Sequence, residues 1–249
     1  MNFSNKSMKL SRFFILIMLM AGIKVSAQNR VWTVGMQLKP IFSSRAFGTG
    51  PKVMTDRSLL YTLRPRGGYA AGMVVRRGYT QRLSFEFGIN FTARNYQVNV
   101  QGGPVPAENR FRIVAYEIPL SQLVFVRLSE YIYMNASGGL SVNMFPSDVA
   151  RNNDPLLVYA GRELIIHPGL LANVGFEYRS RKSGYYYLGA SLNRPFRQIY
   201  TLSARYQVGS QVVSSVLSGF RGTYLTLDLR YFFHEDPDKK IRKKQNGKN

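Results

Sequence analysis

Leu83-Ser84-Phe85-Glu86-Phe87-Gly88-Ile89-Asn90-Phe91 alternates large apolar residues with small or polar ones at every step. Side chains alternate between the two faces of a β-strand, so one face of this segment is entirely apolar and the other carries Glu86 and Asn90. In a soluble sandwich the apolar face packs into a core. In an outer-membrane barrel it faces lipid, and the polar face lines the interior. The remaining sequence discriminates between these two arrangements.

The first 27 residues have the pattern of a secretory signal peptide. Lys6, Lys9 and Arg12 precede an apolar run over 13–23, and Val25-Ser26-Ala27 fits a small-x-small cleavage site. The run is too short for the roughly 20 residues of a membrane-spanning helix, which is the less favoured alternative. We therefore predict a signal peptide over 1–27, a folded region over 28–233 and a basic, disordered periplasmic tail over 234–249.

Eight segments show the alternation and the aromatic enrichment of β-strands. They lie near 30–43, 68–79, 82–94, 111–127, 131–144, 163–179, 184–193 and 220–233. The connections between them are alternately short and long, and the long ones run near 44–67, 95–110, 145–162 and 194–219. Transmembrane barrels have short periplasmic turns and longer outer loops, whereas a Greek-key sandwich has no reason to keep that rhythm.

The pattern predicts an all-β, eight-stranded antiparallel transmembrane β-barrel of the outer-membrane type, with four long outer loops and both termini in the periplasm. Trp and Tyr collect where a barrel wall meets the lipid headgroups. Trp32, Tyr79, Tyr131 and Tyr178 fall at the periplasmic end of the predicted strands, as such a girdle requires. A soluble periplasmic β-sandwich or lipocalin-like barrel is the alternative, and it predicts extraction without detergent.

The inward faces of the predicted strands collect charges of both signs. They are Lys39, Arg76, Glu86, Arg94, Glu117, Glu177, Asp228 and Arg230. Buried charges are unfavourable unless they are paired. Because the interior of an eight-stranded barrel is just wide enough for side chains to fill, we expect these residues to form a salt-bridged plug.

The formal net charge of +21 invites a nucleic-acid function. The basic residues are scattered through turns, loops and lumen without a recognition helix, so no nucleic-acid partner is expected. Arg and Lys also pair with the phosphates of lipopolysaccharide. Candidate contacts in the first outer loop are Arg45, Lys52, Arg57, Arg64 and Arg66. An ordinary solvated basic loop is the alternative.

Catalytic and metal-binding patterns are sparse in this sequence. His167 has no Ser or acid placed beside it by spacing, so a packed lumen histidine is a better interpretation than a general base. No cluster of potential metal ligands is recognisable in the sequence. We expect no catalytic, cofactor-binding or metal-binding residue, although an enzyme site assembled across strands would escape motif analysis.

Four segments carry a resemblance to a known group. They are Tyr116-Glu117-Ile118-Pro119-Leu120, Gly175-Phe176-Glu177-Tyr178-Arg179, Gly184-Tyr185-Tyr186-Tyr187-Leu188-Gly189-Ala190-Ser191 and Asn193-Arg194-Pro195-Phe196. The chain resembles the outer-membrane β-barrel proteins of the Bacteroidota, often labelled porin-like or PorT-like. The resemblance covers essentially the whole predicted barrel and implies the fold and the outer membrane of a Gram-negative bacterium. It implies no functional residue.

The expected function is that of a non-enzymatic structural or interaction protein. Its outer loops would contact outer-membrane lipid, lipopolysaccharide or envelope proteins, and we expect a monomer. One alternative is a narrow, anion-preferring transport channel, motivated by the arginines of the lumen. Another is an accessory role in a secretion or gliding apparatus, with which PorT is associated.

Overall fold

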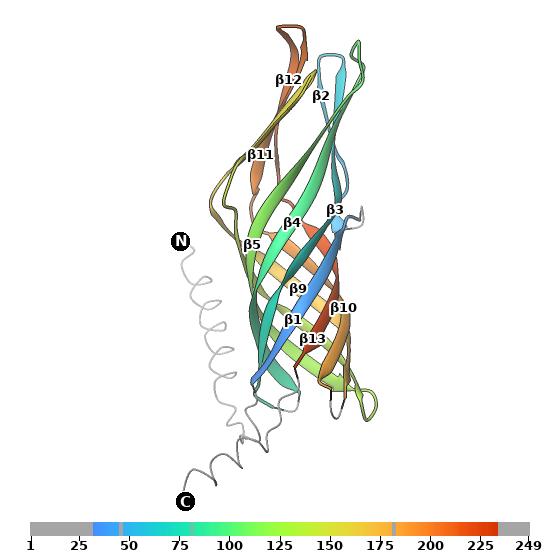
Figure 1. The fold of residues 1–249 in the computed structure, drawn as a ribbon, viewed down its shortest axis with the longest axis vertical. Coiled ribbons are helices and arrows are strands. Elements are labelled where there is room, and N and C mark those ends of the chain that lie inside the picture. The colour runs from blue at the N-terminus through green and yellow to red at the C-terminus, as the bar shows by residue number, and fades with distance from the viewer. Residues whose placement is uncertain (1–31, 45–46, 81, 181–182, 234–249) are drawn as a thin grey trace, which may run out of the picture.

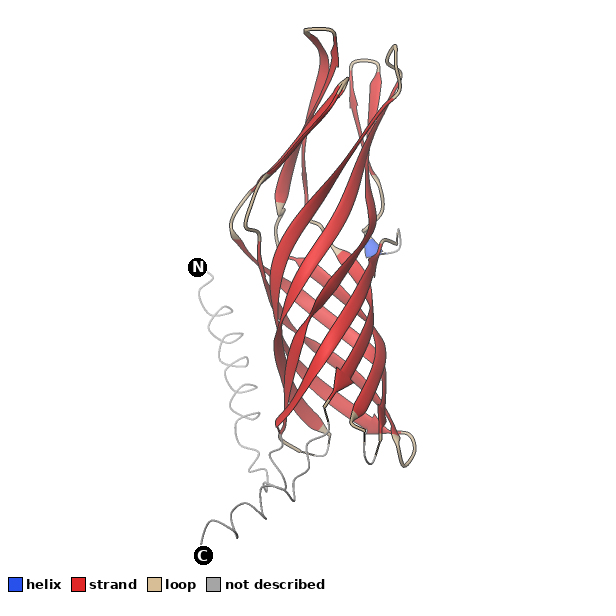
Figure 2. Ribbon diagram, viewed as in Figure 1, coloured by secondary structure: helices blue, strands red, loops and turns tan. Residues whose placement is uncertain are grey.

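The computed structural model describes residues 32–44, 47–80, 82–180 and 183–233. The chain over these ranges is almost entirely β-structure (Figure 2). The predicted signal peptide and the predicted tail lie outside the described residues. Within the described ranges, no helix has the length and apolar character needed to cross a membrane.

Eight strands close into a barrel (Figure 1). In order around the ring they are β1 (Trp32–Phe42), β3 (Leu59–Gly78), β4 (Leu83–Gln101), β5 (Ala107–Arg127), β6 (Ile132–Met144), β9 (Ile166–Arg179), β10 (Tyr185–Pro195) and β13 (Tyr224–Phe232). The ring closes because β1 pairs antiparallel with both β3 and β13. The predicted eight-stranded antiparallel barrel is therefore confirmed.

The short connections gather at one end of the barrel. They join β3 to β4, β5 to β6 and β9 to β10, as the sequence predicts. Trp32 and Phe233, the first and last described residues, lie at this same end, because Trp32 pairs with Arg77 next to the turn that joins β3 to β4 and Phe233 is bonded to Val34 of β1. Phe233 donates its backbone N–H to the carbonyl of Val34 at 2.9 Å, so the end of the last strand is bonded to the start of the first.

The barrel is apolar outside and polar inside. Along β1 the burial alternates at every residue, with Met36 and Leu38 exposed and Gln37 and Lys39 buried. In the segment 83–91, Glu86 and Asn90 are buried on the inward face. This is the reverse of a soluble core and is the arrangement of a barrel in lipid.

The long connections contain strands that the sequence analysis assigned to loops. They include β2 (Lys52–Asp56), β7 (Val149–Asn153), β8 (Leu156–Arg162), β11 (Tyr200–Val208) and β12 (Gln211–Phe220). β2 pairs with β3, and the other four form a separate sheet in the order β12-β11-β8-β7. β3, β4 and β5 also extend beyond their predicted bounds, by nine, seven and four residues. We call the additional strands and the outer parts of β3, β4 and β5 the extension; it forms the upper half of the molecule in Figure 1.

The inward face changes from polar to apolar along single strands. Toward the extension, the buried inward residues of β4 are Ser84, Glu86, Asn90, Thr92, Arg94, Tyr96, Val98 and Val100. On β5 the outward face changes in the opposite sense, from exposed Leu120 and Tyr116 to exposed Arg112 and Arg110. The barrel thus has a polar interior and an apolar surface, whereas the extension has an apolar interior and a polar surface, as in a soluble protein. This inversion marks the limit of the lipid-facing band on the side of the extension.

The extension has its own hydrophobic core. Side chains of both of its sheets contribute, including Tyr61, Ile113, Leu156, Leu202 and Tyr206, each with no exposed surface. A register shift between Pro65 and Gly68 moves β3 from one inward-facing parity to the other, so that Tyr61 and Leu63 reach this core. Burial of this much apolar surface is what holds the predicted loops as sheets.

Candidate functional site

Ion pairs cross the lumen of the barrel. Arg76 on β3 places Nη1 2.5 Å from Oε2 of Glu177 on β9 and Nη2 3.2 Å from Oε2 of Glu86 on β4. Glu177 also accepts from Nε of Arg179 at 2.7 Å. The side chains of Arg76, Glu86 and Glu177 are almost completely buried. These residues join strands that lie on different sides of the barrel.

A second set of pairs continues the chain to the remaining strands. Arg230 on β13 donates from Nη1 to Glu86 and from Nη2 to Oδ2 of Asp228, the latter at 2.7 Å. Lys39 on β1 lies 3.5 Å from the same Asp228 oxygen. The result is one continuous network from Arg179 to Lys39. It contains six of the eight lumen charges that the sequence predicts.

Aromatic rings pack against the cations of this network. The guanidinium of Arg76 lies 3.9 Å from the ring centre of Phe232 and 5.2 Å from that of Phe125. The guanidinium of Arg230 lies 4.8 Å from the ring of Tyr187. Cation–π contacts of desolvated guanidinium groups are favourable. The lumen at this level is therefore filled by ion pairs and rings together.

The other two predicted charges lie in a separate layer, nearer the extension. Glu117 accepts hydrogen bonds from Asn193 Nδ2 at 3.0 Å and from the hydroxyl of Tyr224. Arg94 donates from Nη1 to the carbonyl of Gly222 at 2.8 Å, and its guanidinium faces the ring of Tyr224. Within the described ranges, Arg94 Nε and Nη2 have no hydrogen-bond partner and Arg94 forms no ion pair.

His167 is a packed residue of the barrel interior. It is buried, its ring packs edge-on against Phe145, and Nε2 lies 3.1 Å from the carbonyl oxygen of Leu164. Among the described residues, no acid or hydroxyl side chain is hydrogen-bonded to its ring. Over those same residues, no three His, Asp or Glu side chains are grouped so that they could hold a metal ion.

The candidate lipopolysaccharide contacts of the first loop fall into three groups. Arg45 lies outside the described residues. Lys52 Nζ on β2 donates to Gly219 O at 2.7 Å, and Arg57 Nη1 in the turn after β2 donates to Val213 O at 2.6 Å, so both residues bind to β12. Arg66 donates to the side chain of Gln97, and Arg64 is exposed on β3. Two of these cations thus already hold the extension together.

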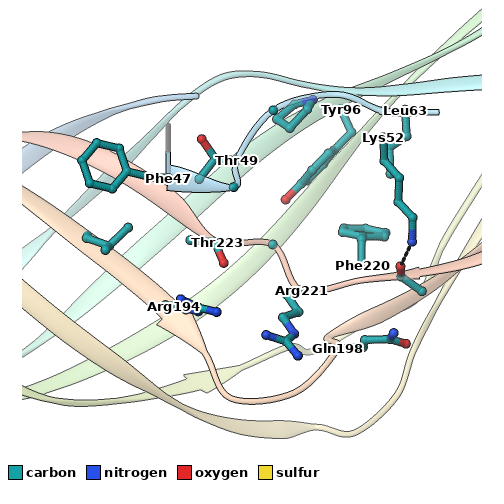
Figure 3. Close-up of a pocket in the computed structure, with 16 residues that line it drawn as sticks. Phe47, Thr49, Lys52, Leu63, Tyr96, Arg194, Gln198, Phe220, Arg221 and Thr223 are labelled. Carbon is teal, nitrogen blue, oxygen red and sulfur yellow. Dashed lines mark hydrogen bonds between the residues drawn. The ribbon is translucent and has the colours of Figure 1, made fainter. Parts of the chain in front are cut away.

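A lateral cavity of about 610 Å³ lies between the extension and the outer ends of β10 and β13 (Figure 3). Three cations line it: Lys52 from β2, Arg194 from β10 and Arg221 from the segment before β13. Phe47, Leu63 and Phe220 are among its apolar residues. Sequence analysis does not find this site, because its residues come from segments far apart in the chain and share no motif.

Outer-membrane proteins are among the solved structures to which this chain is similar. OprG from Pseudomonas aeruginosa matches with a TM-score of 0.51 and 13% identity, over 82% of this chain and 96% of that chain. The translocator domain of autotransporter NalP from Neisseria meningitidis matches with a TM-score of 0.33 and 8% identity, over 92% and 95% of the two chains. The outer-membrane protease OmpT from Escherichia coli matches with a TM-score of 0.30 and 9% identity, over 84% and 100%.

No protein-family model and no curated protein matches the sequence. The similarity to OprG is a similarity of fold. Together with the apolar outer wall and the buried polar lumen, it assigns the chain to the outer-membrane β-barrel fold.

Proposed function

We propose that the protein is an outer-membrane barrel whose lumen is closed by ion pairs, and that it is a non-enzymatic scaffold for the extension. The contact between Arg76 and Glu177, on opposite walls of the barrel, is the observation that carries this proposal. Removing one member of a buried ion pair leaves the other charge uncompensated, at a cost of about 3–5 kcal/mol. A continuous water path at this level would have to separate several such pairs.

The extension provides a second barrier and the functional surface. Its apolar core lies directly beyond the Arg94 layer, and Phe145, Tyr200 and Phe220 belong to it. Ions do not cross a packed apolar core without a large desolvation penalty. A sheet structure with a core of its own is also well suited to presenting a fixed surface to envelope proteins or to lipopolysaccharide. The exposed Arg64 and Arg66 are candidate contacts for lipopolysaccharide phosphates.

Solute flux tests the proposal. Purified protein is reconstituted into liposomes, and swelling is followed in isotonic solutions of sugars and of amino acids. A heat-dependent shift in gel mobility verifies that the barrel is folded. We expect swelling no faster than that of protein-free liposomes; rapid entry of small solutes would contradict the closed lumen.

A narrow, anion-preferring channel is the second candidate. It is favoured by Arg94, a buried guanidinium with two nitrogens that have no partner among the described residues. An anion that entered the outer part of the lumen could bind there. This function predicts anion-selective conductance that Arg94→Gln reduces.

The proposal includes a location and an orientation. A cleaved signal peptide over 1–27 would export the chain, and both termini would lie in the periplasm together with a basic tail over 234–249. This orientation is supported by the short turns, Trp32 and Phe233, which all lie at one end of the barrel. The resemblance to Bacteroidota barrels supports the outer membrane of a Gram-negative bacterium. An accessory role in secretion or gliding would use the extension as the contact surface.

A further inference from the structure

The lateral cavity lies at the outer limit of the lipid-facing band. Leu188 is an exposed residue of the β10 outer wall, and Leu192 and Arg194 follow on the same face toward the extension. Leu192 and Arg194 both line the cavity. The wall thus changes from apolar to cationic where the cavity opens. Lipid phosphates lie at this level when a barrel is embedded by its apolar band.

The charges of the cavity have one sign. Lys52, Arg194 and Arg221 line it, and none of its sixteen lining residues is acidic. Within the described part of the chain, Arg194 and Arg221 form no ion pair, and both are exposed. Lys52 is held over the cavity by its bond to Gly219 O, drawn as a dashed line in Figure 3. Cations without acidic partners at a concave surface favour an anionic ligand.

The segment that carries Arg221 is fixed from inside the barrel. Arg94 donates to the carbonyl of Gly222, whose φ of 64° is in the left-handed region. A Cβ at Gly222 would lie 2.3 Å from Cδ1 of Ile199, so no larger residue fits there without a shift. This lumen contact holds the turn between β12 and β13 in place, and a preorganised turn lowers the entropic cost of ligand binding.

Apolar side chains complete the cavity. Phe47 is 55% exposed although it lines the cavity, and Leu192 continues the lipid-facing wall. A phosphate alone would use only the cations, whereas an acidic lipid would also cover these apolar groups. The volume of about 610 Å³ lies within the range of ligand pockets.

We propose that this cavity binds the phosphate headgroup of an acidic lipid, with Lys52, Arg194 and Arg221 around the phosphate and Phe47 and Leu192 against the start of an acyl chain. The inference rests on the proposed position of the barrel in the outer membrane. It does not depend on whether the lumen is closed, so a negative binding result leaves the flux experiment unaffected.

Binding to the full-length protein in a non-ionic detergent tests the proposal. The probes are dihexanoyl phosphatidic acid, dihexanoyl phosphatidylcholine and inorganic phosphate, measured by titration calorimetry. The variants are the double substitution Arg194→Gln/Arg221→Gln, Phe47→Ser and the charge control Arg205→Gln. Arg205 is exposed on β11 and does not line the cavity. Gel mobility verifies the fold of each variant.

We expect phosphatidic acid to bind more tightly than either other probe, because it combines an accessible phosphate with acyl chains. The double variant should lose about tenfold or more in affinity, since charge-assisted bonds to phosphate are removed. Phe47→Ser should weaken lipid binding, and Arg205→Gln should leave it unchanged. Equal binding of inorganic phosphate, with no effect of Phe47→Ser, would identify a phosphate site and overturn the lipid assignment. No binding, or equal losses in Arg205→Gln and the double variant, would overturn the site altogether.

Discussion

Arg76 on β3 and Glu177 on β9 meet across the barrel, with Nη1 and Oε2 2.5 Å apart. Three strands separate β3 from β9 in either direction around the eight-stranded ring. The pair therefore spans a full diameter. Because Arg76 also contacts Glu86, the network joins three parts of the wall at one level of the lumen.

Replacing Arg76 by Met should destabilise the barrel strongly. Glu86 and Glu177 would each lose a cationic partner while remaining buried, and such losses cost about 3–5 kcal/mol. The free energy of unfolding, measured by urea titration in lipid vesicles, tests this. The control is Arg110→Met, which removes an ion pair with Glu108 whose side chains are 70% and 43% exposed. The control should change stability by about 1 kcal/mol or less, and equal losses in the two variants would contradict the buried network.

Because the polarity inverts along the strands, substitution by Arg should destabilise the protein at an exposed apolar residue of the barrel but not at one of the extension. Ile89 is 52% exposed on the outer face of β4 within the barrel, and Val53 is 58% exposed on β2 in the extension. Ile89→Arg places a charge in lipid and should cost up to about 2–4 kcal/mol. Val53→Arg places the same charge in water and should change stability by about 0.5 kcal/mol or less. The stability of both variants is measured by folding yield into vesicles and by urea titration. An Ile89→Arg variant as stable as the wild type would place this face outside the membrane.

It should be possible to destabilise the core of the extension without unfolding the barrel. Leu202→Ala creates a cavity in that core and should destabilise it by about 2–5 kcal/mol. Leu217→Ala, at a residue that is 75% exposed, should have little effect. Limited proteolysis should cut the extension of the Leu202 variant while the barrel keeps its heat-dependent gel mobility. Cleavage patterns identical to wild type would show that the core does not hold the extension.

Asp56 links β2 to β12 and should make this contact sensitive to acid. Its carboxylate accepts from the hydroxyl of Ser214 at 2.7 Å and from the N–H of Ser215 at 3.1 Å. These two hydrogen bonds lower the pKa of Asp56 below its ordinary value of 3.8, and the bond from the Ser214 hydroxyl has the larger effect. A lowered pKa means that the contact is fully present above pH 3.8 and is lost as the pH falls through the lowered pKa.

The backbone amide resonance of Ser215 reports on this titration. In detergent micelles it should shift with a midpoint below pH 3.8, and Asp56→Asn should abolish the shift. A midpoint at or above 3.8 would show that the carboxylate is not stabilised by β12.

The barrel could be predicted because its alternation is repeated over many residues. In 83–91 and in 32–39 of β1, every second side chain is large and apolar, and the intervening ones are small or polar. Strand parity also fixes the face of each residue, so the eight lumen charges could be selected without a structure. Their partners could not, because a contact such as Arg76 with Glu177 depends on the tilt and stagger of strands on opposite walls.

The strands of the extension could not be predicted from the alternation of apolar and polar residues. β8 and β11 are short, and their inward residues, such as Val158 and Leu202, are ordinary soluble-type core residues. These strands pair with each other although β9 and β10 lie between them in the chain. Because the predicted barrel pairs each strand with its neighbours in the sequence, β8 and β11 are assigned to loops. The cavity was missed for a related reason, since only this packing brings Arg194, Arg221 and Lys52 together.

Single-channel conductance in a planar bilayer tests the closed lumen most directly. Heat-dependent gel mobility first shows that the protein is folded. Wild type and the Arg76→Met variant are then added to the bilayer in equal amounts. We predict that the wild-type barrel inserts and remains silent, because the Arg76 and Glu177 side chains join opposite walls. Steady, ion-selective openings of the folded wild-type protein would contradict this account and make the protein a channel.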